Sequence, residues 1–306
     1  MSGVEIYNFD SWLPYDGFAE GSGRSEKIWL QSPEGQIGLF KYPKSENEGH
    51  TSEHISEHLA YMLGKILNVP IARVNIGYYN GRIGCMSYLI NEKDEDIVEA
   101  ALFITENHPG YNLESMIDND TGKYYCLEHV FEIASSNKMR FRVIQMMVFD
   151  YIIGNSDRHQ NNWALIRKYG SIKSGTLLLR FCPLYDNGSS LCCYANESIV
   201  AGCLGPDKNR FKSQVDSKSK SLIRIDGYSK NRPTHIEMLK HLLENHPETS
   251  IIVEEFLKKL RPYNMDRLID SYSNLLSQNK ITLIKAFLHW KIDMLFKLRY
   301  GERNET

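Results

Sequence analysis

The chain of 306 residues lacks several features that mark specialised classes of protein. Its 36 Lys and Arg residues nearly balance its 38 Asp and Glu residues, so the formal net charge is −2. This balance excludes a protein that holds nucleic acid mainly through contacts to the phosphates. No run of about 18 apolar residues occurs, which argues against a membrane-spanning helix, and residues 1–10 lack the regions of a secretory signal. We expect a soluble, cytoplasmic protein, and leave secretion or translocation into a host cell open.

The chain also lacks a cysteine pattern typical of a metal site or of a disulfide framework. There is no CxxC pair and no cluster of histidines that would complete a zinc site. The hydrophobic fraction of 42% and the aromatic fraction of 11% are those of a globular protein with a real core. We therefore expect buried thiols at all six positions, namely Cys85, Cys126, Cys182, Cys192, Cys193 and Cys203.

The N-terminal part has the periodicity of strands, with one helix between them. Alternating apolar residues on either side of a Ser-Pro-Glu-Gly turn predict a hairpin over residues 26–41. Residues 52–67 repeat apolar side chains with helical period, and residues 69–89 alternate again around an Asn-Gly turn. The predicted order is β-β-α-β-β, preceded by a loop that contains Gly17, Gly21 and Gly23.

The remainder of the chain has mostly helical patterns. Helices are predicted over Leu127–Ser135 and Arg140–Ile153, with three or four more over Ile236–Leu298. The apolar residues of Arg140–Ile153 surround most of its circumference, which indicates a buried helix. We interpret the acidic run of residues 92–96 as a solvated linker. Short strands fit only around residues 163–166 and 177–181.

A polar segment follows the predicted buried helix directly, at Gly154-Asn-Ser-Asp-Arg-His-Gln-Asn-Asn-Trp163. A loop held between rigid elements is where catalytic groups tend to lie. Asp157 and Asn162 are separated by five positions. This is the separation used in phosphoryl-transfer loops, where the Asp orients a hydroxyl and the Asn binds a metal ion.

Three further residues complete a series in the order that ATP chemistry requires. Lys41 ends an apolar strand after the glycine loop, Glu57 lies on the next helix, and Asp186 precedes Gly188 after a second strand. Each alone has an ordinary interpretation: a solvated lysine, a surface carboxylate with Glu53 competing for its role, and a common β-turn. His159 alone would be a structural histidine. The combination favours ATP-dependent phosphoryl transfer, with Lys41 and Glu57 as a candidate ion pair.

The sequence resembles the HipA-like protein kinases, which are toxin components of bacterial toxin–antitoxin pairs. The resemblance rests on Asp157-Arg-His-x-x-Asn162, Tyr185-Asp186, Leu39-Phe-Lys41 and Leu67-Asn-Val-Pro70. It implies an α+β, bilobal protein-kinase-like fold. Residues 1–87 would form a small β-rich N-terminal ATP-binding lobe, and residues 88–306 a larger, mostly helical catalytic lobe. The Asp-Arg-His-x-x-Asn form also resembles the catalytic loop of phosphatidylinositol kinases.

The resemblance also implies a set of roles, with ATP and Mg²⁺ as cofactors. Asp157 would be the catalytic aspartate, Asn162 and Asp186 the catalytic metal ligands, and Lys41 the contact to the α- and β-phosphates. Residues 86–90 would be the hinge that reads adenine through its backbone. The cofactor-binding set comprises Gly21, Ser22, Gly23, Lys41, Glu57, Ser87, Tyr88, Leu89 and His159, and the candidates for autophosphorylation are Ser22 and Ser25.

The implied partners are a protein substrate, such as an aminoacyl-tRNA synthetase or another translation-related protein, and a DNA-binding antitoxin. Direct contact with nucleic acid or membrane is not expected. Two alternatives stay open: a phosphatidylinositol-type lipid kinase, and a non-catalytic pseudokinase that serves as a binding module. A locally basic segment, residues 207–232, holds eight Lys or Arg against three Asp. We favour a solvated, mobile loop there over a docking site for an acidic partner or an RNA-bearing substrate.

Overall fold

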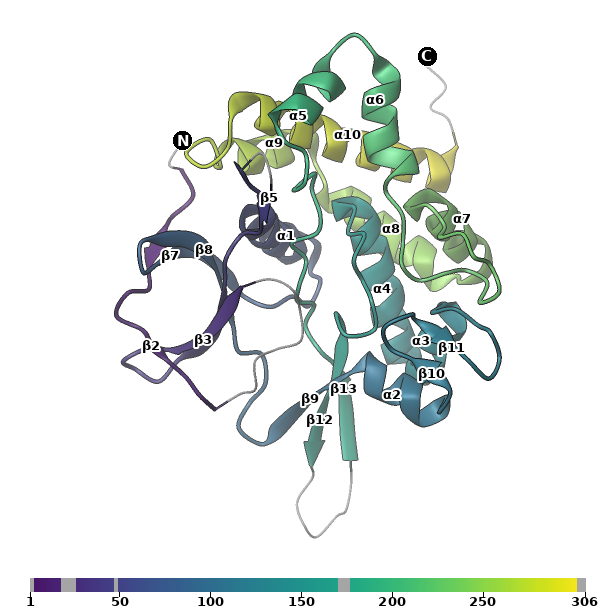
Figure 1. Ribbon diagram of the computed structural model, residues 1–306. Coiled ribbons are helices and arrows are strands. Elements are labelled where there is room, and N and C mark those ends of the chain that lie inside the picture. Colours follow the sequence, from purple (N-terminus) through teal and green to yellow (C-terminus); the bar gives the residue numbers. More distant parts are fainter. Residues whose placement is uncertain (1–2, 18–25, 47–48, 170–176, 302–306) are drawn as a thin grey trace.

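The computed structural model describes residues 3–17, 26–46, 49–169 and 177–301 (Figure 1). A curled β-sheet formed by the N-terminal residues lies beside α1 (Glu53–Leu67), and a larger, mostly helical part follows it. The predicted α+β class, with a small β-rich part before a larger helical one, is confirmed. Among the described residues, no helix is both long and apolar enough to cross a membrane.

The N-terminal sheet confirms both predicted hairpins. Strands β3 (Lys27–Gln31) and β4 (Ile37–Lys41) pair antiparallel. So do β7 (Val74–Tyr79) and β8 (Arg82–Tyr88), whose turn at Asn80 and Gly81 has φ of 49° and 70°. Positive φ at both central residues is what a type I′ turn requires. Across the sheet the order is β1 (Tyr7–Asn8), β7 (Val74–Tyr79), β8 (Arg82–Tyr88), β4 (Ile37–Lys41), β3 (Lys27–Gln31) and β2 (Leu13–Pro14).

Two apolar clusters hold the N-terminal part together and join it to the rest. One cluster, which includes Phe9, Leu30 and Phe40, fills the inside of the curled sheet. Helix α1 confirms the helix predicted over residues 52–67, and its buried Leu59 and Leu63 belong to the large cluster that also contains the helices of the C-terminal part. Burial of this shared core positions the sheet against the helices. The short pair β5 (Ser45–Glu46) and β6 (Gly49–His50) precedes α1.

The C-terminal part is built around one long buried helix, α4 (Asn137–Ile153), which confirms the prediction for this segment. Its residues from Val143 to Ile153 are all buried. The other helices in this part are α2 (Ala100–Asn107), α3 (Leu127–Ile133), α5 (Glu197–Leu204), α6 (Lys208–Lys212), α7 (His235–Asn245), α8 (Glu248–Lys259), α9 (Pro262–Asp270) and α10 (Gln278–Tyr300). In Figure 1, α7, α8 and α10 lie around α4.

The end of α4 sets where the polar loop begins. Gly154 caps the helix with φ of 66°, a left-handed conformation that only glycine adopts at little cost. A Cβ atom at this position would lie 2.7 Å from a ring atom of Phe287 on α10. Glycine is therefore required at this point, and the chain turns out of the core directly into the residues that carry the predicted chemistry.

The interpretation of residues 92–96 as a solvated linker holds for residues 92–94, which are exposed and lie outside the strands, but it is wrong for Glu95 and Asp96. Strand β9 (Glu95–Glu99) forms the edge of a three-stranded sheet with β12 (Ala164–Tyr169) and β13 (Leu177–Phe181). Glu95 is buried and accepts hydrogen bonds from the Arg180 guanidinium on β13, the shorter of them 2.7 Å long. Arg180 neutralises the Glu95 carboxylate, and this ion pair allows an acidic side chain to be buried in a strand. The short strands β10 (Tyr111–Asn112) and β11 (Ile117–Asp118) form a separate pair.

The favoured interpretation of residues 207–232 as a mobile loop is also wrong for its first part. Helix α6 is followed directly by a π-helical turn over Ser213–Ser217. Farther on, Arg224 and Lys220 form isolated β-bridges with Cys126 and Thr234. These contacts attach the segment to the helical part. The exposed residues Lys208, Arg210, Lys212 and Lys218 keep the basic character of its surface.

All six cysteines are free and buried, as predicted. Burial raises the pKa of the Cys182 thiol to about 12, and it also raises the pKa of Cys85 and Cys193. A buried thiol that stays protonated is a poor nucleophile. Within the described ranges, no group of three or more His, Cys, Asp and Glu side chains is placed to hold a metal ion.

Candidate active site

One buried arginine organises the predicted catalytic segment. The Arg158 side chain donates to both carboxylate oxygens of Asp150 on α4, at 3.0 and 2.8 Å. It also donates to the carbonyl oxygens of Asn162 and Tyr185 and to Oδ1 of Asn187, at 2.7, 3.0 and 2.7 Å. Arg158 thus joins the end of α4, the Asp157–Asn162 loop and the segment around Asp186. Removing one partner of such a buried pair costs about 3–5 kcal/mol.

The loop places Asp157 and Asn162 together. The Asn162 side-chain nitrogen donates to the Asp157 carbonyl oxygen at 2.8 Å, and the Asp157 amide donates to Oδ1 of Asn155 at 3.0 Å. Both contacts use the Asp157 backbone, and no hydrogen bond or ion pair from the described part of the chain holds its carboxylate. Burial, together with the charge of Asp186, raises the pKa of Asp157. His159 follows closely, and its ring nitrogen Nδ1 accepts from the Asn161 amide at 3.2 Å.

Lys41 and Asp186 form an ion pair across 145 positions of sequence, with 2.8 Å between Nζ and Oδ1. The charge of Lys41 is the first cause that lowers the pKa of Asp186, to about 2. Burial alone would lower the pKa of Lys41, but the charges of Asp186 and Glu57 raise it. Both groups are therefore charged. Because 47% of the Asp186 side chain is exposed, one carboxylate group can hold Lys41 and still reach a ligand.

The expected Lys41–Glu57 pair is replaced by this contact, although Glu57 lies close by. Glu57 is buried, and its Oε1 accepts from the side-chain nitrogen of Asn187 at 3.3 Å. Burial raises the pKa of Glu57, which the charge of Lys41 opposes. Glu53, the alternative, binds Lys44 instead, at 3.0 Å. The sequence did not predict two of these contacts. The ion-pair partner of Lys41 is Asp186, and the next residue, Asn187, is hydrogen-bonded to Glu57 on α1.

The predicted hinge forms the end of β8. Ser87 pairs with Leu39 of β4 and with Val74 of β7. The amide of Tyr88 donates to the Arg73 carbonyl oxygen and that of Leu89 to the Ile37 carbonyl oxygen, each at 3.0 Å. These two amides are therefore already used within the protein. A nucleotide base bound at this edge would therefore contact backbone carbonyl oxygens of this segment and the residues that follow Leu89.

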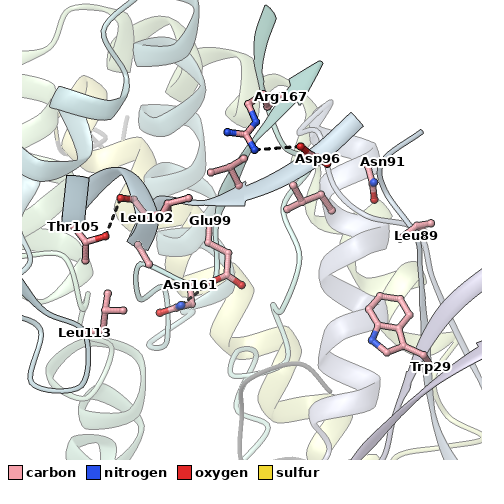
Figure 2. A pocket seen from close by; sticks show the side chains of 13 residues that line it. Trp29, Leu89, Asn91, Asp96, Glu99, Leu102, Thr105, Leu113, Asn161 and Arg167 are labelled. Atoms are coloured by element: carbon pink, nitrogen blue, oxygen red, sulfur yellow. Dashed lines mark hydrogen bonds and ion pairs between the residues drawn. The ribbon is translucent and has the colours of Figure 1, made fainter. Parts of the chain in front are cut away.

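A pocket of about 800 Å³ lies where this strand end faces the catalytic loop (Figure 2). Trp29 and Leu89 lie on one side of it, and Glu99 and Asn161 on the other. The Asn161 side chain donates to Oε2 of Glu99 at 2.6 Å, which joins the loop to the start of α2. The volume is within the usual range for a small-molecule site. Also lining the pocket are Asn91, Asp96, Ile97, Val98, Ala101, Leu102, Thr105, Leu113 and Arg167.

Four sequence predictions lie outside the described residues: Gly21, Ser22 and Gly23 of the glycine loop, and Ser25. Their flanks are described. Lys27, just after them, begins β3 opposite Lys41 on β4. Burial is the first cause that lowers the pKa of Lys27, and Lys41 adds to it. Lys27 and Lys41 thus lie on the same face of the sheet.

The chemistry of these donors fits a magnesium ion. Asp186 is ionised, and Asn162 uses its side-chain nitrogen within the loop, so its amide oxygen is the atom left for a ligand. Carboxylate and amide oxygens are the ligand types that Mg²⁺ takes, usually together with waters and phosphate oxygens. Two protein ligands therefore suffice here.

Comparison with known proteins shows which proteins the chain is similar to in sequence and in fold. No family model matches the chain. A curated relative, the serine/threonine-protein kinase CtkA of Helicobacter pylori (strain J99), is 21% identical over 295 residues, 86% of each chain. The crystal structure of this H. pylori proinflammatory kinase superposes with a TM-score of 0.79 at 16% identity, over 96% of this chain and 99% of that one. The Shewanella oneidensis HipA, solved with HipB and operator DNA, superposes with a TM-score of 0.53 at 14% identity, over 100% of this chain and 68% of HipA.

The chain is thus similar in sequence to the serine/threonine kinase CtkA, and it shares the fold of CtkA and of HipA. The resemblance inferred from the sequence motifs is thereby confirmed.

Proposed function

We propose that the chain transfers the γ-phosphoryl group of Mg²⁺-bound ATP to a serine or threonine of a protein, itself included. The observation that carries this proposal is the Lys41–Asp186 ion pair beside the Asp157–Asn162 loop, with Arg158 joining the two. This arrangement places a cation for phosphates, two oxygen ligands for a metal and a carboxylate for a hydroxyl within one site. The pocket beside Leu89 and Asn161 would take the nucleoside.

Each residue of the candidate active site has a defined role in this proposal. Lys41 binds phosphate oxygens, Asn162 and Asp186 hold the metal ion, and Asp157 orients the attacking hydroxyl and accepts its hydrogen bond. The metal ion, when bound, supplies charge that offsets the phosphates. Glu57 on α1 accepts a hydrogen bond from Asn187, the residue after Asp186, and its charge acts on Lys41.

The proposed partners follow from the relatives. HipA was solved in complex with HipB and operator DNA, and HipA-like kinases are toxin components. We propose that this chain likewise associates with a small DNA-binding antitoxin in a cytoplasmic setting. A translation-related protein, such as an aminoacyl-tRNA synthetase, stays the predicted substrate.

The test is incubation of the purified chain with Mg²⁺ and radiolabelled ATP, together with dephosphorylated casein and phosphoinositide vesicles. We expect label on serine or threonine, located by mass spectrometry, and no label with the Asp157→Asn variant. Label on the lipid alone would replace this proposal by a lipid kinase. Tight nucleotide binding without label on any acceptor would replace it by a non-catalytic binding module.

Acidification should affect catalysis before it affects nucleotide binding. The ionised form of Asp157 is active, so activity is present above its pKa and is lost as the pH falls through it. Because that pKa is raised, the loss of kcat/KM should begin above the ordinary aspartate value of 3.8. Asp186, with a pKa of about 2, stays ionised over this range, so Mg·ADP affinity should fall only as protonation of ADP itself requires. A further loss of Mg·ADP affinity in parallel with kcat/KM would contradict the assignment.

A further inference from the structure

Lys44 follows Lys41 by three residues, in the connection that leads from β4 to α1. Its Nζ lies 3.0 Å from Oε1 of Glu53, and 38% of its side chain is exposed. Its carbonyl oxygen accepts from the Thr51 amide at 2.9 Å, so the backbone at this point is held as well. A partly exposed lysine whose backbone is held in place can contact a ligand with only a small loss of conformational entropy.

Glu53 is itself held from several sides. The Thr51 hydroxyl and the Tyr194 hydroxyl each donate to it at 2.8 Å. The Tyr194 hydroxyl in turn lies 2.8 Å from Oγ of Ser189. The Ser189 carbonyl oxygen accepts from the Ser156 amide at 3.3 Å, one residue before Asp157. A continuous series of hydrogen bonds therefore leads from Lys44 to the catalytic loop.

The charges around Lys44 are those of the active site. Burial alone would lower its pKa, but Glu53, Asp157 and Asp186 together raise it, so the amine is protonated at neutral pH. The charge of Lys44 in turn opposes the raised pKa of Asp157. Lys41, in contrast, is already bound by Asp186 at 2.8 Å. Lys44 is thus a cation that Glu53 holds in an ion pair, within electrostatic range of Asp157.

We propose that Lys44 is a further catalytic residue, which binds the phosphoryl group during its transfer to the hydroxyl at Asp157 and is positioned there by Glu53 and Tyr194. This inference rests on the proposed kinase function. In the step, the bond from γ-phosphorus to the bridging oxygen of ADP breaks and a bond to the hydroxyl oxygen forms. The hydroxyl proton leaves toward Asp157, and Lys44 stays protonated while it donates to a non-bridging oxygen. Charge that develops on these oxygens is where a preorganised cation stabilises the transition state most.

The test compares Lys44→Met with Lys44→Arg and with Lys65→Met, which removes an exposed lysine of α1. For Lys44→Met we expect kcat for phosphoryl transfer to fall about 100-fold. The affinity for Mg·ADP, measured by calorimetry, should stay within about threefold, because ADP lacks the transferred group. Lys44→Arg should recover at least about tenfold of the loss, since a guanidinium also donates to phosphate oxygens.

The outcomes separate this inference from the kinase proposal. If wild type transfers phosphate and Lys44→Met keeps kcat within about threefold, the role of Lys44 is wrong and the kinase function stands. A loss of kcat with an equal loss of Mg·ADP affinity would make Lys44 a structural residue. A failure of Lys44→Arg to recover activity, with an unchanged melting temperature, would also contradict a charge contact. If wild type itself transfers nothing, the kinase proposal fails first.

Discussion

Replacing Asp157 by asparagine should abolish phosphoryl transfer and leave Mg·ATP binding nearly unchanged. The substitution keeps the size of the side chain and removes the charge that accepts the hydroxyl hydrogen bond. Its backbone contacts, to Oδ1 of Asn155 and to the side chain of Asn162, do not depend on the carboxylate and are retained. Loss of a positioned general base or orienting carboxylate lowers kcat about 10²–10⁴-fold. We expect about 10³-fold in the initial rate of label transfer.

The matched control is Asp94→Asn, which removes an exposed carboxylate that pairs with Lys168 outside the site. Its kcat should stay within about twofold of wild type, because exposed pairs contribute little. Calorimetry with Mg·ATP then decides the role of Asp157. If the Asp157→Asn variant loses nucleotide affinity as strongly as it loses turnover, Asp157 binds the nucleotide or metal ion and does not orient the hydroxyl.

The local parts of this site were predictable from the sequence. Helix α4 and the loop after it are adjacent in the chain, so a pattern of apolar residues followed by a polar run places Asp157 and Asn162 in one short segment. The two hairpins of the N-terminal sheet were predictable for the same reason, since turn residues and alternation are local signals. Such features depend on few distant contacts.

The contacts between distant segments were not predictable in this way. Lys41 had two acidic candidates on the following helix, and its partner proved to be Asp186, 145 positions away. A strand-end lysine carries no local signal for which carboxylate the fold will bring to it. No role was predicted for Arg158, although it lies inside the Asp157–Asn162 motif. Its five hydrogen bonds connect three segments that only the tertiary structure brings together.

Strand β9 shows how composition can mislead. Its residues Glu95–Glu99 include three acidic side chains, which are rare in strands and common in solvated linkers. The strand forms because β12 offers a pairing edge and because Arg180 and Arg167 neutralise Glu95 and Asp96. Tertiary context therefore overrode the local propensity of these residues. The sequence did not predict that this strand lines the pocket, as Glu99 at its C-terminal end does.

Replacing Asp186 by asparagine should have a different effect from Asp157→Asn, because it removes both the metal ligand and the partner of Lys41. The ion pair at 2.8 Å is lost, and the half-buried lysine keeps the nearby charge of Glu57. A neutral amide also binds Mg²⁺ more weakly than a carboxylate does. We expect Mg·ATP affinity to fall at least about tenfold and kcat to fall about 10³-fold or more.

Calorimetry with ATP, run with Mg²⁺ and again with excess chelator, separates the two losses in Asp186→Asn. Wild type should bind ATP more tightly with the metal ion than without it, and the variant should show little difference between the two conditions. If the variant still gains affinity from Mg²⁺ as wild type does, Asp186 is not a metal ligand, and its role is to hold Lys41. If the affinity for ATP in excess chelator also falls, the loss of the contact that positions Lys41 accounts for this decrease, because Lys41 binds phosphate directly in this proposal.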